Sequence, residues 1–319
     1  MSSVAQVVDF PSLYRKLLLI RRVEEEIARI YPSDKIKSPV HLSIGQEAVA
    51  VGVCDPLRRD DVVSGTYRSH ASYIAKGGDL RALFAELYGK DTGCARGKGG
   101  SMHLVDMNQY VLGTSAVVGT TVPVAVGYAL ALRREGKGRV VVAFFGDGAT
   151  EEGVFYESLN FAALHRLPVL FVCENNFLAI HTPIEKRWAT RRLCERVQTY
   201  GIPAQQVTDS DVLQIRQFAI EALGSMRERG GPSFIECHTY RWREHVGPRE
   251  DYDDGYRSRD ELVRWQAKDQ VLTIGSRLAA GEKLSIEAEI EREVADAIQF
   301  AETSPFPDSK ELYTHVFAE

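Results

Sequence analysis

The sequence predicts an α/β fold, in which helices flank both faces of a doubly wound and mostly parallel β-sheet. Two short β-rich apolar runs, at residues 139–145 and 168–174, lie on either side of a segment with 3.6-residue periodicity at residues 154–165. Strand, helix and strand in this order form a βαβ unit of a parallel sheet. A further buried strand at residues 233–237 follows a helix near residues 212–226, so helices and strands alternate through the middle of the chain.

The other helices are predicted from periodicity and from helix-stop signals. Apolar residues recur every three to four positions across residues 11–31, as in an amphipathic helix. A second helix covers residues 45–53 and ends before Pro56. The small apolar residues of 122–134 predict a helix that packs closely against a neighbour, either within the chain or at a subunit interface. The C-terminal helices are expected over about residues 258–303, at 260–278 and 286–301, before the SPFP stretch at 304–307.

Composition and charge are those of an ordinary globular protein. The chain of 319 residues, 44% hydrophobic and 26% charged, is long enough to bury a substantial core. No repeat or linker divides it, so residues 1–319 are expected to form one domain. The net charge of −5 and the scattered Lys and Arg residues argue against nucleic acid as a partner. No apolar run has the roughly 18 residues that a membrane span needs, and we expect a cytoplasmic protein with no membrane attachment.

Polar residues follow both strands of the βαβ unit. The sequence GDGA (146–149) ends the first strand, and ENN (174–176) ends the second. Both ends lie at the carboxyl edge of the sheet, where open α/β sheets bind ligands and where a helix N-terminus favours an anion. Asp147 would repel that anion unless a cation bridged the two. Mg²⁺ prefers oxygen ligands from protein and phosphate together, so Asp147 and the side-chain oxygen of Asn176 are candidate ligands.

A GDG sequence by itself is also typical of an ordinary turn. A dinucleotide-binding site fits less well, because GDGATEEG lacks the third glycine, and the GKG at 97–99 lacks the flanking residues of a P-loop. GDG followed by NN on the next strand end resembles the thiamine diphosphate fingerprint of transketolase-like enzymes. Residues 91–119, rich in Gly, Ser and Thr, are a candidate ligand loop.

Four more motifs extend this resemblance to nearly the whole chain. They are HLSIGQEA (41–48), TYRSH (66–70), RGKGGSMH (96–103) and YRWREH (240–245). Together they resemble the alpha subunit of the thiamine diphosphate-dependent decarboxylating component of 2-oxo acid dehydrogenase complexes, the pyruvate, branched-chain and acetoin dehydrogenase family. The similarity runs from the first helix to the SPFP stretch.

The resemblance implies a set of cofactor contacts. Tyr67 and Arg68 would contact the diphosphate, which an arginine can bind with two parallel hydrogen bonds. Gly148 and Ala149 would lie against the same diphosphate, and the backbone of Val118 would hydrogen-bond the aminopyrimidine ring.

The resemblance also implies the metal ligands and two active-site histidines. Asp147, Asn176 and the main-chain oxygen of Leu178 would bind Mg²⁺. His41 and His245 resemble the histidines, and His245 would also contact the cofactor from a loop that orders when cofactor binds. His70 and His103 are weaker candidates, and the histidines expected to be structural or exposed are His165, His181, His238 and His315.

Several positions depart from the commonest family pattern. Leu178 stands where an aromatic residue is frequent, and Ala116 where a glycine often occurs. Val246 replaces the serine that kinases modify in mitochondrial relatives, so we expect no such regulation here. Arg243 and Glu244 replace a His-Gly pair on the loop that would receive substrate or a lipoyl arm.

The family implies a function and partners. Thiamine diphosphate would add to a small 2-oxo acid and accept the electrons left by departing carbon dioxide. In the family the activating glutamate lies in a separate pyrimidine-binding domain, for which this chain is too short. We therefore expect a beta subunit in an α₂β₂ heterotetramer, and acyl transfer to the lipoyl group of a dihydrolipoyl acyltransferase. Two alternatives stay open: an acetoin-cleaving or acyl-transferring (carboligase-like) enzyme subunit, and a scaffold that has lost the cofactor.

Overall fold

A six-stranded parallel sheet forms the centre of the computed structural model, which describes residues 8–314. The start of the N-terminal segment and His315 lie outside the described residues. The strand order is β2-β1-β3-β4-β8-β7, and a separate antiparallel hairpin joins β5 and β6. The strands are β1 (Val62–Thr66), β2 (Val111–Ser115), β3 (Val141–Gly146), β4 (Val169–Asn175), β5 (Leu178–Ala179), β6 (Thr182–Pro183), β7 (Ala204–Val207) and β8 (Ser233–His238).

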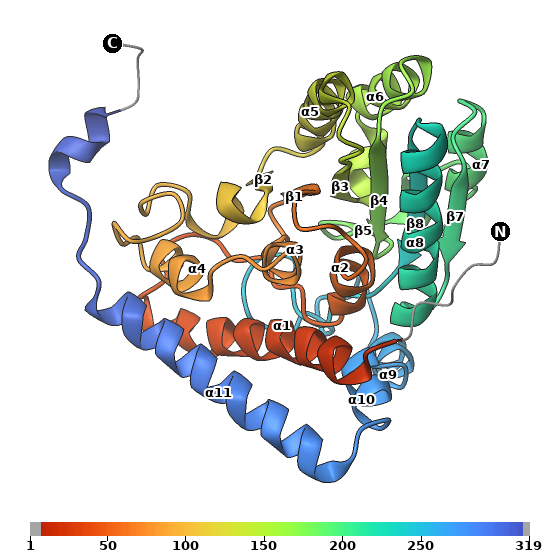
Figure 1. Cartoon of the computed structure of the whole chain (residues 1–319). Coiled ribbons are helices and arrows are strands. Elements are labelled where there is room, and N and C mark those ends of the chain that lie inside the picture. Colours follow the sequence, from red (N-terminus) through yellow and green to blue (C-terminus); the bar gives the residue numbers. More distant parts are fainter. Residues whose placement is uncertain (1–7, 315–319) are drawn as a thin grey trace.

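Helices cover both faces of this sheet, as Figure 1 shows. Alternate strand residues explain the two layers: Val141 and Phe145 share one apolar core with α5 and α6, while Val142 and Phe144 share the other with α2 and α8. Outside the second layer, α1 packs against α11. The helices are α1 (Phe10–Ile30), α2 (Glu47–Cys54), α3 (His70–Ala75), α4 (Leu80–Leu87), α5 (Thr121–Glu135), α6 (Gly153–Leu164), α7 (Leu193–Gln198), α8 (Val212–Arg229), α9 (Arg259–Gln266), α10 (Gln270–Gly275) and α11 (Ala280–Thr303). The predicted α/β doubly wound class is confirmed.

The strand order places a topological switch between β1 and β3. The chain passes from β1 to β2 on one side, then crosses back to β3 on the other side of β1. Connections that leave neighbouring strands in opposite directions open a crevice at their carboxyl ends, and ligands of such sheets bind there. The motif-bearing ends of β1, β3 and β4 meet at this crevice.

The sequence patterns did not predict β5, β6, α3, α4 or α7, and they also missed three strands of the central sheet and one helix break. The strands β1, β2 and β7 were not predicted, because VVSGT, VLGTS and AQQV are short and carry polar or glycine residues. The segment 91–119 is therefore not all loop, since it contains β2. The single helix expected at 260–278 is two helices, because Asp269 caps α10 at the Val271 amide.

The last helix is longer than its periodicity predicted. It begins at Ala280 and not near residue 286.

No helix in the part of the chain that the structure describes is both long and apolar enough to cross a membrane.

Candidate functional site

A cavity of about 250 Å³ opens at the carboxyl ends of β1, β3 and β4. Every predicted site residue except His41 lines it. The lining residues are Gln46, Thr66, Tyr67, Arg68, Val118, Gly119, Gly146, Asp147, Gly148, Ala149, Glu152, Glu174, Asn176, Leu178, Ala179, Ile180 and His245.

The parallel register of β3 and β4 brings the two halves of the GDG…NN motif together. Gly146 pairs with Glu174 across the two strands, so Asp147 and Asn175 are the next residues at the same sheet edge. A side chain at Gly148 would place its Cβ 3.1 Å from that of Ala179, tighter than an ordinary contact. Glycine at 148 therefore lets the turn after β3 lie close to β5.

The two asparagines at the end of β4 have different hydrogen-bond partners and different roles. Asn175 is structural: its Nδ2 donates to Glu236 at 2.7 Å and its Oδ1 accepts from the Phe177 amide at 3.0 Å. Asn176 is turned to the cavity, with its Nδ2 donating to Gln46 at 3.0 Å. Oδ1 of Asn176 accepts the Leu178 amide at 3.2 Å, and because a backbone N–H can only donate, this bond fixes which end of the side-chain amide carries the oxygen.

The donor set at this edge fits a magnesium ion. Asp147 offers a carboxylate that is 1% exposed, Asn176 an amide oxygen and Leu178 a main-chain oxygen. All are oxygen ligands, and Mg²⁺ completes its octahedral coordination with phosphate and water. Among the described residues no group of three or more His, Cys, Asp and Glu side chains could hold a metal ion, so a metal here would need these mixed oxygen ligands.

Arg187 pairs with Asp147, a contact that sequence reasoning missed. Its Nη2 binds Oδ2 of Asp147, and its Nη1 binds Glu151. Burial raises the pKa of the Asp147 carboxyl, while the Arg187 guanidinium acts in the opposite direction. No local pattern signals this pair, because the two residues are 40 positions apart and meet only after the β5–β6 hairpin.

Arg68 is held rigidly at the end of β1. Its Nη1 donates to the Leu42 carbonyl at 2.8 Å and its Nη2 to the His245 carbonyl at 3.0 Å. The same Nη2 lies 3.3 Å from Nδ1 of the His245 ring. Burial lowers the pKa of Arg68 to about 10, which keeps the guanidinium charged at neutral pH.

His41, Tyr67 and His245 form a cluster of three rings. The His41 centroid lies 4.4 Å from Tyr67 and 5.1 Å from His245. Burial, with the nearby Arg68 charge, lowers the pKa of His41 to about 3 and that of His245 to about 2. Both rings are therefore neutral at pH 7. Nδ1 of His41 is buried without a hydrogen-bond partner, and His41 reaches the cavity only through its ring contacts with Tyr67 and His245.

A buried ionic network organises the loop that carries His245. Asp251 binds both Arg241 and Arg257, and each of these side chains is 1% exposed. Arg257 also donates to the main-chain oxygen of Arg243 at 2.9 Å. The unusual Arg243-Glu244 pair is thus part of the loop's framework, since Glu244 accepts from the Arg249 amide at 2.8 Å.

Glu174 is a further cavity residue that the sequence reasoning did not select. Burial raises the pKa of its carboxyl to about 8, and the charge of Arg68 opposes that shift. Glu174 is the second-last residue of β4, and its burial there favours the neutral form of the carboxyl group.

The weaker histidine candidates lie away from the cavity. His70 is fully buried, with Nδ1 3.1 Å from Glu24 and Nε2 2.8 Å from Ser101, and is a satisfied core residue. His103 is exposed.

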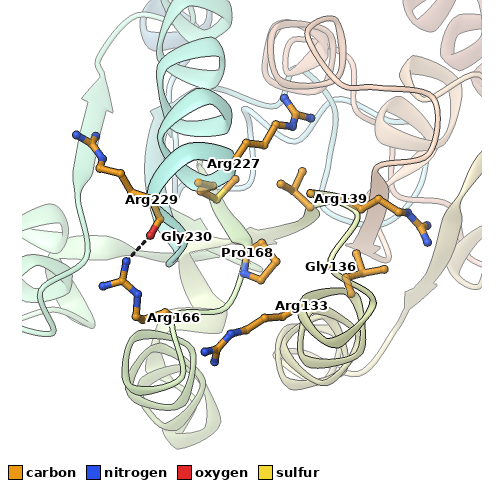
Figure 2. A pocket seen from close by; sticks show the side chains of 12 residues that line it. Arg133, Gly136, Arg139, Arg166, Pro168, Arg227, Arg229 and Gly230 are labelled. Carbon is orange, nitrogen blue, oxygen red and sulfur yellow. Dashed lines mark hydrogen bonds between the residues drawn. The ribbon is translucent and has the colours of Figure 1, made fainter.

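A second cavity, of about 290 Å³, lies at the opposite, amino-terminal edge of β3 and β4 and is drawn in Figure 2. The arginine side chains around it bind other groups of the protein. Arg166 donates to the Arg229 carbonyl, Arg133 to the His165 carbonyl, and Arg227 pairs with Asp61. Cations at the carboxyl ends of helices complement the helix dipoles, and we assign these arginines a structural role.

Comparisons with known proteins identify the family of this chain. Residues 15–310 match the family model described as dehydrogenase E1 component. The chain is 40% identical over 310 residues to the alpha subunit of acetoin:2,6-dichlorophenolindophenol oxidoreductase from Bacillus subtilis, covering 96% of this chain and 92% of that protein. It is 38% identical over 312 residues to the alpha subunit of the pyruvate dehydrogenase E1 component from Rhizobium meliloti, covering 95% and 88%. The chain therefore belongs to the dehydrogenase E1 component family and is an alpha subunit of the 2-oxo acid dehydrogenase type.

Proposed function

We propose that this chain anchors thiamine diphosphate through Mg²⁺ and, together with a beta subunit, catalyses oxidative decarboxylation of a small 2-oxo acid with acyl transfer to a lipoyl group. The observation that carries the proposal is the meeting of Asp147, Asn176 and Leu178 in one cavity with Arg68. The cavity lining thus combines oxygen ligands for a cation with a fixed positive charge for a diphosphate. We place the protein in the cytoplasm.

The cofactor, when bound, supplies the carbanion chemistry of decarboxylation. This chain's residues hold and orient it. Asp147, Asn176 and the Leu178 carbonyl would bind Mg²⁺, and Tyr67, Arg68, Gly148 and Ala149 would lie along the diphosphate. The Val118 backbone would face the aminopyrimidine ring.

His245 can offer a defined hydrogen-bond donor to the site. Arg68 can only donate, so Nδ1 of the neutral His245 ring accepts from it and Nε2 carries the proton. We propose that the His245 Nε2–H donates a hydrogen bond to substrate or cofactor. His41 would act indirectly, by packing against the His245 and Tyr67 rings.

The family places part of the active site on a beta subunit. We propose an α₂β₂ heterotetramer that delivers the acyl group to a dihydrolipoyl acyltransferase, and we expect this chain alone to have no turnover. Acetoin cleavage is the second candidate, favoured by the Bacillus subtilis relative and by an alpha subunit of the same name from Cupriavidus necator at 36% identity.

The test is a cofactor-binding and turnover assay on the chain copurified with its beta subunit. Pyruvate, branched 2-oxo acids and acetoin are offered with an artificial electron acceptor, Mg²⁺ and thiamine diphosphate. Asp147→Ala should abolish turnover and weaken cofactor binding by at least about 100-fold, because Asp147 is the one charged side chain among the three ligands proposed for the metal. Asp254→Ala, an exposed carboxylate, is the matched control. Cofactor binding that is unchanged in Asp147→Ala would refute the site, and turnover of acetoin alone would select the second candidate.

A further inference from the structure

Arg187 binds the carboxylate at the centre of the proposed metal site. Besides its ion pairs with Oδ2 of Asp147 and with Glu151, its Nε donates to the Thr182 carbonyl at 3.0 Å. The side chain is 7% exposed. Three protein contacts therefore fix a buried guanidinium directly beside a proposed metal ligand.

The backbone that carries Arg187 is anchored on both sides. Ile184 and Trp188 are buried in the core shared by α5 and α6, and Trp188 Nε1 donates to Glu151 at 3.2 Å. The anchored backbone thus keeps the Arg187 side chain within reach of Asp147. A metal ion held by Asp147 would therefore have the Arg187 guanidinium as a neighbour.

With a metal ion bound, two cations would share the Asp147 carboxylate. Positive charges a few ångströms apart inside a protein repel strongly enough to weaken metal binding by roughly tenfold or more. A diphosphate brings at least two negative charges and offsets that repulsion. With both ligands present, the fixed charge of Arg187 faces a neutral or anionic metal–diphosphate unit.

We propose that Arg187 is a positioning residue that couples metal binding to diphosphate binding, so that the chain takes up the divalent cation weakly alone and tightly together with the cofactor. The inference rests on the proposed cofactor site. Because coupling between two ligands is reciprocal, Arg187 must also make cofactor affinity depend on the metal by the same factor.

The experiment measures Mn²⁺ affinity by electron paramagnetic resonance or calorimetry, using metal-stripped protein copurified with the beta subunit, with and without thiamine diphosphate. In the wild-type protein the cofactor should raise Mn²⁺ affinity strongly. Arg187→Gln keeps hydrogen-bonding capacity but removes the charge, so Mn²⁺ alone should bind roughly tenfold tighter and the enhancement by cofactor should fall by about the same factor.

Two further variants separate charge from structure. Arg187→Lys keeps the charge and should retain most of the wild-type coupling. Arg191→Gln removes an exposed arginine of the same segment that pairs with Glu185, and should change nothing. Thermal unfolding of each variant confirms that it is folded.

Three outcomes overturn the inference. Coupling in Arg187→Gln that equals the wild-type value refutes it and leaves the proposed function intact. Arg187→Lys behaving like Arg187→Gln shows that geometry and not charge is responsible. If the wild-type protein binds neither Mn²⁺ nor thiamine diphosphate, the proposed function itself fails.

Discussion

At the scale of single residues, burial sets the charge state of this site. Arg68 keeps its positive charge although it is buried, whereas His41 and His245 lose theirs beside it. One fixed cation and two neutral rings thus lie together at the end of β1. A histidine in a motif does not reveal this difference, since it depends on the neighbours that the fold supplies.

The lowered histidine pKa values predict acid sensitivity with a definite sign. The unfolded chain takes up protons on these histidines below about pH 6.5, whereas the folded chain resists them. This contribution to stability is complete above that pH and is lost as the pH falls toward about 3 for His41. In the cofactor-free protein, His41→Gln should make the unfolding temperature fall less steeply between pH 7 and 5.

Comparing variants isolates this effect from the acidic groups, some of which have raised pKa values and act with the opposite sign. His103→Gln, which changes an exposed ring, is the control. An identical pH slope in His41→Gln and the parent protein would contradict the assignment of His41 as a buried neutral base.

At the scale of elements, capping residues set boundaries that periodicity alone does not. Asp269 is the N-cap of α10, because its side chain accepts a hydrogen bond from the Val271 amide. The same carboxylate forms an ion pair with Arg21 of α1 at 3.1 Å. The apolar spacing continues across this point, so the sequence reads as one helix. The long-range ion pair to α1 explains why the chain breaks there.

The two roles of Asp269 predict a larger effect than a cap alone. Asp269→Ala should lower the free energy of unfolding by about 2–4 kcal/mol, because it removes a cap and leaves a buried arginine with one partner fewer. Asp211→Ala removes only the cap of α8, at the Leu213 and Gln214 amides, and should cost about 1 kcal/mol. Denaturant titrations compare them, and equal losses would show that the Arg21 pair contributes nothing.

At the scale of the whole molecule, the sheet brings the site residues together at one edge. The helix layer formed by α5 and α6 keeps exposed apolar side chains on its outer face. α5 buries Val122, Ala125 and Ala129 against the sheet, but Val124 is 55% exposed. On the neighbouring α6, Phe161 and Leu164 are exposed as well. The small-residue helix therefore packs inside the chain on one face and presents apolar surface on the other.

This surface predicts where the beta subunit binds. Val124→Asp should reduce copurification of the beta subunit severalfold, because a charge in an apolar interface is costly to desolvate. Its effect on the unfolding temperature of the isolated chain should be small. Size-exclusion chromatography with light scattering measures the assembly, and Leu284→Asp on α11, also exposed, is the control. Equal assembly in the two variants would place the interface elsewhere.

Sequence alone determined the fold class, the family and the residues that meet at the carboxyl edge of the sheet. It could do so because β3, α6 and β4 follow one another along the chain, and parallel strands in sequence must bring GDG and NN to one edge. Local periodicity and motif order carry that information without knowledge of distant contacts.

The tertiary structure alone decided the partners of those residues. Arg187 on Asp147, Gln46 on Asn176 and the Asp251 network under His245 join segments that are separated by loops, and no spacing rule connects them. The short strands β1, β2 and β7 belong here too, since they gain stability from neighbours on the sheet and not from their own composition. Charge state, side-chain partners and strand membership follow from long-range packing, which local sequence patterns do not encode.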